Sequence, residues 1–147
     1  MTEKKITYAL ARIRSCKENG YHLEGLLKSY HLNIDLVKFI LESSSPGHSF
    51  ENKKIKAIVQ EFLKESDANP TLKMIINKRS IKALKPWLLK MDLFFKNLKL
   101  QYPTNLSALQ DETEKIFGIL KISANKLFVK NKFFPSTSVS SPGHKFL

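Results

Sequence analysis

Cysteine is nearly absent from the sequence, because Cys16 is the single cysteine among 147 residues. A lone cysteine cannot form a disulfide within the chain, and we expect its thiol to lie buried or half-buried on an early helix. No stretch approaches the roughly 20 uninterrupted apolar residues that a membrane-spanning helix needs. Lys4 and Lys5 follow Met1 too closely for a secretory signal. We therefore expect an intracellular protein in a reducing compartment, the nucleus or the cytoplasm.

Patterns typical of catalysis and metal binding are missing as well. The four histidines and Cys16 show no spacing that is known from metal sites. No serine or cysteine has a base and an orienting group at a recognisable spacing, and no glycine-rich loop is present that would cradle a phosphate. We expect no metal and no cofactor, and we expect that the protein is not an enzyme.

Glycine and proline are scarce, with five and six residues, whereas 42% of the chain is hydrophobic. This composition is typical of a chain that forms a core, and a single domain of this length buries about 70% of its unfolded surface. Apolar residues recur at intervals of three and four, and no stretch shows the alternation of a strand. The sequence therefore predicts an all-α fold, a single bundle of about five to seven helices.

Composition divides the chain into a helical domain, which contains a linker, and a C-terminal tail. The predicted helical domain covers residues 1–132. Within it, the segment 43–49 is rich in serine, with a Pro-Gly pair, and is the expected linker between an N-terminal three-helix part and the remaining helices. Residues 133–147 are rich in serine and proline and cannot build a core, so we expect a C-terminal tail that is disordered or docked.

Capping residues mark several helix boundaries. Thr2 is a suitable N-cap for a first helix, and Asn19-Gly20 is a suitable end, because both residues tolerate a left-handed backbone. The sequence 67–70, Asp-Ala-Asn-Pro, is the expected end of another helix. The last long helix is predicted to begin near residue 104 or 105, and its acids precede its lysines, which suits the helix dipole.

The segment 80–102 carries a long apolar stripe at a spacing of three and four, made of Ile81, Leu84, Leu88, Met91, Phe95, Leu98 and Tyr102. Further apolar residues on both sides widen the stripe, which predicts a helix with neighbours on several sides at the centre of the bundle. Pro86 lies inside the segment and clashes with the carbonyl of Lys82, at a cost of about 3 kcal/mol in an unbroken helix. We therefore expect a kink or a break there.

Residues 23–42 resemble a helix-turn-helix motif. In this interpretation one helix ends near Tyr30, His31 and Leu32 form the turn, and Asn33 caps the second helix. However, that second helix carries two acids, whereas base reading normally uses Arg, Lys, Asn or Gln on this surface. An ordinary helical hairpin is therefore favoured over a sequence-reading DNA motif.

The formal net charge is +12 at pH 7, and it is unevenly distributed. Residues 1–50 hold seven Lys/Arg and five Asp/Glu, residues 51–100 hold twelve and five, and residues 101–147 hold six and three. Residues 51–100 therefore contribute a net charge of +7, against +2 for residues 1–50 and +3 for residues 101–147. Such a field favours polyanions, either nucleic acid, an anionic membrane or an acidic protein.

Seven cations within residues 51–100 are the candidate phosphate ligands: Lys53, Lys54, Lys56, Lys78, Arg79, Lys82 and Lys85. Phosphate binding needs only point charges at suitable spacing, which lysine supplies. Because most of the seven are lysines without accompanying stacking aromatics, we expect backbone contacts with little base specificity. The leading hypothesis is a non-catalytic protein that acts on or beside nucleic acid. Lysines that only keep the surface soluble are the alternative interpretation.

A second hypothesis is a protein-interaction subunit or adaptor of a larger complex, with an acidic or apolar protein partner. The candidate partner-binding residues lie on the surplus apolar face of segment 80–102 and at the end of the tail, and they are Leu89, Leu93, Leu100, Phe146 and Leu147. The segment 44–50 recurs as 140–146 with six of seven residues identical. This repeat makes Ser45 and Ser141, each followed by proline, candidate phosphorylation sites, although a chance match between two linkers is the alternative.

Overall fold

The computed structural model describes residues 1–45, 49–50, 52–98 and 106–133. This part of the chain forms six helices and no strand, which confirms the predicted all-α bundle. The helices are α1 (Glu3–Glu18), α2 (His22–Ser44), α3 (Ile55–Ala68), α4 (Pro70–Ile75), α5 (Lys78–Asn97) and α6 (Leu106–Phe133). None of these six is both long enough and apolar enough to cross a membrane.

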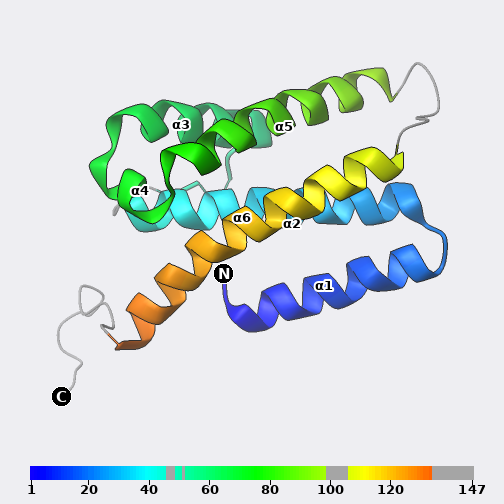
Figure 1. Ribbon diagram of the computed structural model, residues 1–147, viewed down its shortest axis with the longest axis horizontal. Coiled ribbons are helices and arrows are strands. Elements are labelled where there is room, and N and C mark those ends of the chain that lie inside the picture. The colour runs from blue at the N-terminus through cyan, green and yellow to red at the C-terminus, as the bar shows by residue number, and fades with distance from the viewer. Residues whose placement is uncertain (46–48, 51, 99–105, 134–147) are drawn as a thin grey trace.

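Helix α2 is the element around which the others pack (Figure 1). It lies against α1, α3, α4 and α6, and the ring of Tyr30 on α2 contacts Trp87 and Phe95 of α5. The prediction that segment 80–102 is the central helix is therefore wrong. Helix α5 buries one face only, because its other positions carry lysines, which are too costly to bury without partners; Leu89 and Leu93 lie among them, exposed.

Helix α2 continues from His22 to Ser44 without interruption, so both interpretations of residues 23–42, the helix-turn-helix motif and the helical hairpin, are wrong. No glycine or proline follows Gly25 in this helix, and nothing in the backbone forces a turn. Leu32 and Asn33, at the expected turn, are buried. The Nδ2 atom of Asn33 donates a hydrogen bond of 3.0 Å to the carbonyl oxygen of Thr113. Packing against α6 therefore keeps this region helical.

The boundaries of the predicted linker also change, because α2 includes residues 43 and 44. Residues 46–48 lie outside the described part, and α3 begins only at Ile55. Helix α5 runs through Pro86, so of the predicted kink or break, the break is absent. Pro86 has no amide hydrogen to donate to the carbonyl of Lys82. Both residues lie on the exposed side of α5, so water can hydrate this carbonyl instead.

Several local predictions are confirmed. The Oγ1 atom of Thr2 accepts a hydrogen bond of 3.2 Å from the amide of Lys5, and Gly20 has a positive φ of 78° after α1. Asn69 follows the last residue of α3 and caps α4. Cys16 is buried on α1, as expected. The residues at which the last helix was predicted to begin, 104 and 105, lie outside the described residues, which start again at residue 106.

Candidate functional site

One group of predicted phosphate ligands lies at the start of α3, and we call Lys53, Lys54 and Lys56 the α3 cluster. All three are exposed. Lys54 occupies the N-cap position without a capping hydrogen bond from its side chain, and the first turn contains no acid. The partial positive charge of the helix N-terminus therefore adds to the charges of the three lysines.

A second group lies at the start of α5, and we call Lys78, Arg79 and Lys82 the α5 cluster. These side chains are exposed, and the first turn of α5 again contains no acid. Asn77 caps the helix, because its Oδ1 atom accepts a hydrogen bond of 2.8 Å from the amide of Ser80. Two helices of this chain thus begin with concentrated positive charge.

Neither cluster is neutralised within the part of the chain that the structure describes. The four ion pairs there involve other lysines, namely Lys17, Lys28, Lys90 and Lys96. Acids in the first turn stabilise a helix and cations stabilise its last turn, so both clusters have the less stable arrangement. An anion from outside would relieve this imbalance.

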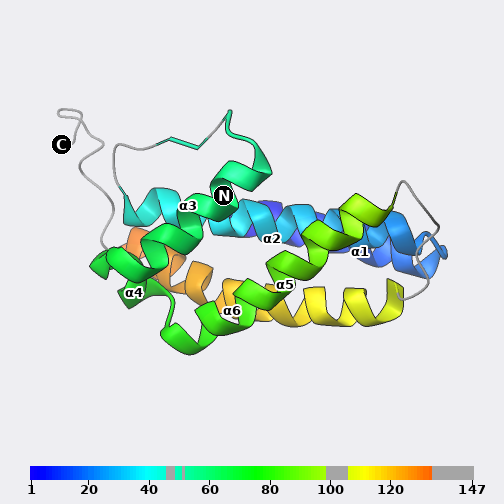
Figure 2. The same cartoon turned by 90° about the horizontal axis from the view of Figure 1, so that it is seen from above.

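The structure brings only some of the seven predicted cations together. Helices α3 and α5 lie side by side and run in opposite directions (Figure 2), so the α3 cluster and the α5 cluster lie at opposite ends of the pair. Lys85 is half-buried one turn beyond the α5 cluster. It lines the same groove as Lys56. The basic surface is therefore divided into two clusters with a groove between the helices.

This groove, the α3–α5 groove, has a volume of about 600 Å³. Tyr30 and His31 of α2 line it together with residues of α3 and α5, and its apolar members are Ile55, Val59, Leu63, Leu88, Leu89 and Phe95. Burial raises the pKa of Tyr30, and the negative charge of Asp92 raises it further. The tyrosine is therefore a neutral part of the groove.

The predicted partner-binding residues are only partly described. Leu89 lines the α3–α5 groove and is 71% exposed, and Leu93, one turn further, is 59% exposed. Leu100, Phe146 and Leu147 lie outside the described residues, as does the predicted tail from residue 134 onward.

Of the two candidate phosphorylation sites, Ser45 is described and Ser141 is not. Ser45 is half-buried directly after α2. Its Oγ atom accepts a hydrogen bond of 3.2 Å from Nδ2 of Asn69. A phosphate on Ser45 would therefore change a contact that joins the end of α2 to the start of α4.

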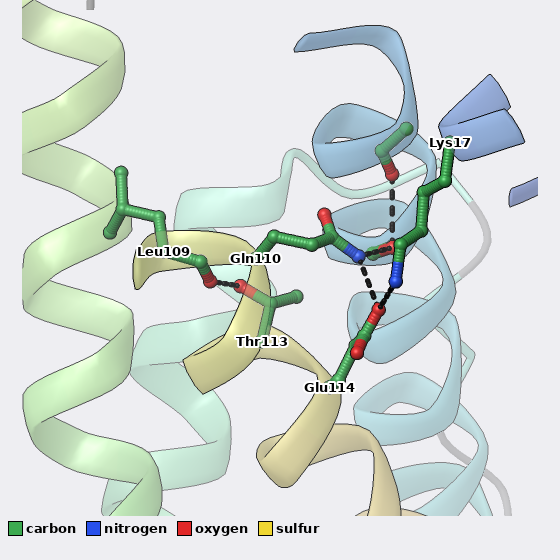
Figure 3. A network of polar contacts seen from close by, with 7 residues as sticks. Lys17, Leu109, Gln110, Thr113 and Glu114 are labelled. Atoms are coloured by element: carbon green, nitrogen blue, oxygen red, sulfur yellow. Dashed lines mark hydrogen bonds and ion pairs between the residues drawn. The ribbon is translucent and has the colours of Figure 1, made fainter. Parts of the chain in front are cut away.

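A chain of polar contacts that the sequence patterns did not indicate connects α1, α2 and α6 (Figure 3). Glu114 accepts hydrogen bonds from Nζ of Lys17 at 2.7 Å and from Nε2 of Gln110 at 2.9 Å. Gln110 also donates to the hydroxyl of Ser29, which in turn donates to the carbonyl of Gly25. Burial acts to raise the pKa of Glu114, but the hydrogen bonds from Gln110 and Lys17 and the positive charge of Lys17 together outweigh burial and lower that pKa. The network links three helices.

Polar residues within the apolar stripe of α6 were the signal that could have revealed this network. Gln110 and Thr113 are buried between Leu109 and Ile116, at positions where periodicity alone predicts apolar side chains. Buried polar groups need partners, but Gln110 donates to Ser29, 81 residues earlier in the chain, and the hydroxyl of Thr113 accepts from Trp87, 26 residues earlier. The network borders a second cavity, of about 530 Å³, between α1, α2 and α6.

Metal-binding clusters are not found in the described part of the chain, where no three His, Cys, Asp or Glu side chains gather closely enough to hold an ion. Comparison of the sequence with protein-family models and with curated proteins, and of the fold with solved structures, finds no match. The surface of this molecule is therefore the basis for its functional interpretation.

Proposed function

We propose that this chain is a non-catalytic nucleic-acid-binding protein that holds phosphates with the α3 cluster and the α5 cluster. One observation carries the proposal. Both clusters lie at helix N-termini, where the dipole also attracts anions, and no described acid forms an ion pair with them. A phosphate backbone supplies the missing negative charges in a regular row.

The spacing of the clusters suits such a backbone. The α3 cluster lies at the start of α3 and the α5 cluster lies at the start of α5, beyond the far end of α3. The 14 residues of α3, roughly 20 Å at a rise of 1.5 Å per residue, therefore set the scale of the separation. Nucleic acid advances 3.4 Å per nucleotide along one strand, so about six nucleotides cover this length. One continuous strand or duplex can therefore contact both clusters.

The chemistry of the clusters favours binding without base readout. Five of their six residues are lysines, which act as point charges rather than as the planar fork that arginine presents to guanine. The aromatic residues of α5 that could stack on bases are Trp87, Phe94 and Phe95, and none of them is exposed. We therefore infer contact with phosphates and little dependence on sequence.

The test is a titration of the full chain against labelled nucleic acid of random sequence. Fluorescence anisotropy with a duplex of about 20 base pairs and a single strand of the same length is measured from ~50 mM salt upward. If all six cations contact phosphates of the duplex, log K falls linearly with log salt with a slope of about −5, since each contact with B-DNA contributes about −0.9. If the chain binds neither the duplex nor the single strand at ~50 mM salt, the proposal is overturned.

A further inference from the structure

We propose that the α3–α5 groove binds an amphipathic helix of a partner protein, with apolar residues on the buried face and acids beside them. This inference goes beyond nucleic-acid binding and depends on different residues. The shape of the groove is the first observation. Its walls are two antiparallel helices and α2 also lines it, so an added helix would lie between neighbouring helices, as helices in bundles do.

The length of the groove sets the length of the bound helix. The lining residues extend from Ile55 to Leu63 on α3 and from Lys85 to Phe95 on α5. At 1.5 Å per residue these walls are about 12 and 15 Å long. The groove therefore accepts two to three helical turns, with anchors spaced at i, i+3 or i+4, and i+7.

The charge of the groove determines the chemistry of its partner. Lys56 contributes one positive charge from α3, and Lys85 contributes another from α5. Asp92 is the only acid among the described lining residues, and its Oδ2 atom is 3.0 Å from Nζ of Lys96, so it is already paired. Acids on both sides of an apolar stripe would complement these lysines.

An exposed leucine of the groove wall, Leu89, is followed by a second exposed leucine, Leu93, which extends the apolar surface beyond the groove. Leu89 and Leu93 are one turn apart on α5 and are both more than half exposed. Their neighbours Lys90 and Lys96 are also exposed, but each pairs with an acid of this chain. Exposed apolar groups of this kind, continuous with a groove, mark interaction sites, and a bound helix would cover them.

Other occupants fit these observations less well. A phosphate backbone gains nothing from apolar walls such as Val59 and Leu63. A second copy of this chain would bring Lys56 and Lys85 against the same positive field, because each chain carries +12. The chain's own residues 134–147 include Lys145 and no acid, so they lack the complementary charge.

The experiment uses two synthetic helical peptides and the full chain. Both peptides carry leucines at i, i+4 and i+7, and the flanking positions are glutamates in one and lysines in the other. By fluorescence anisotropy the acidic peptide should bind at least about tenfold more tightly than the basic one. Replacing both Leu89 and Leu93 by serine should weaken its binding about tenfold, since these side chains supply contact area.

A matched control removes apolar groups elsewhere. Ile122 and Val129 lie on α6 and are 63% and 55% exposed, so I122S/V129S makes the same chemical change away from the groove and should leave peptide binding unchanged. Equal binding of the two peptides, or equal effects of the two double variants, would overturn the proposal. A dimer in sedimentation that L89S/L93S converts to a monomer would also overturn it, because the groove would then hold a second copy.

The same variants separate this inference from the proposed function. The L89S/L93S variant changes no charge and should bind duplex DNA as the natural chain does. The K78Q/R79Q/K82Q variant should bind the acidic peptide within about threefold of the natural chain, because only the long-range field changes. Loss of peptide binding in that variant alone would place the peptide on the α5 cluster and contradict the groove assignment.

Discussion

The indole Nε1 atom of Trp87 donates a hydrogen bond of 3.0 Å to Oγ1 of Thr113, and both side chains are completely buried. The hydroxyl of Thr113 in turn donates to the carbonyl of Leu109 at 2.6 Å. This contact fixes α5 to α6 where neither group can reach water. It therefore helps to hold the helix that carries the α5 cluster and one wall of the groove.

Replacing Thr113 by valine keeps the shape of the side chain and removes the acceptor. The indole donor then remains buried without a partner, which should lower the free energy of unfolding by about 1–3 kcal/mol. Urea denaturation followed by far-UV circular dichroism measures the change. In a W87F background the donor is absent, so T113V should cost clearly less there. An equal cost in both backgrounds would show that the hydrogen bond contributes nothing.

Asn69 and Asn77 are both helix caps, but only Asn69 also contacts α2. Their Oδ1 atoms accept hydrogen bonds from the amides of Leu72 and Ser80. Nδ2 of Asn69 additionally donates to the carbonyl of Ser44 and to Oγ of Ser45. Alanine at either position should cost about 0.5–2 kcal/mol for the cap, and at Asn69 about 1 kcal/mol more. Chemical denaturation that finds N77A as damaging as N69A would contradict the described contact.

Glu114 gives stability a pH dependence with a defined sign. Its pKa is lower in the folded chain than in the unfolded chain, so its contribution is present above the ordinary pKa of glutamate and is lost as the pH falls. The E114Q variant should be less stable than the natural chain at neutral pH and equally stable at strongly acidic pH. The difference should be small, because the side chain is 45% exposed and screened by water. Denaturation at a series of pH values measures this difference in the free energy of unfolding. A difference that grows as the pH falls would contradict the assigned direction of the Glu114 pKa shift.

The continuity of α2 predicts slow exchange at its centre. The amides of residues 31–34 lie within a helix whose side chains Leu32, Asn33 and Ile34 are buried. Their hydrogen exchange should therefore be as slow as that of the flanking turns of α2. Fast exchange confined to these four residues would instead indicate the turn of a helical hairpin.

Local rules were sufficient for the features that depend on neighbours in sequence. The cap at Thr2, the left-handed Gly20 and the helix boundary at Asn69 each follow from the chemistry of a few adjacent residues. The break at residues 31–33 was predicted from polar residues that resemble turn and cap positions. Asn33 is instead buried because Thr113 supplies its partner, and a contact eighty residues away leaves no local signal.

The candidate site likewise combines features that follow from local sequence with features that depend on distant contacts. The exposure of the lysines in the α3 cluster and the α5 cluster could be predicted, because burying an unpaired charge is too costly. The groove between the helices could not be predicted, because it depends on how α4 turns the chain and on which face of α2 remains available. The exposure of Leu89 and Leu93 could be predicted only as a surplus of apolar surface on α5, without the groove beside them.

The central claim, that the clusters contact phosphates, is tested most directly by the salt dependence of DNA binding in two triple variants. K78Q/R79Q/K82Q removes the α5 cluster, and K115Q/K126Q/K130Q removes three exposed lysines of α6. The first should make the slope of log K against log salt shallower by about 2.7, three contacts at 0.9 each. The second should leave the slope unchanged. Equal changes in both variants would show that the DNA responds only to net charge, and the assignment of the clusters would be wrong.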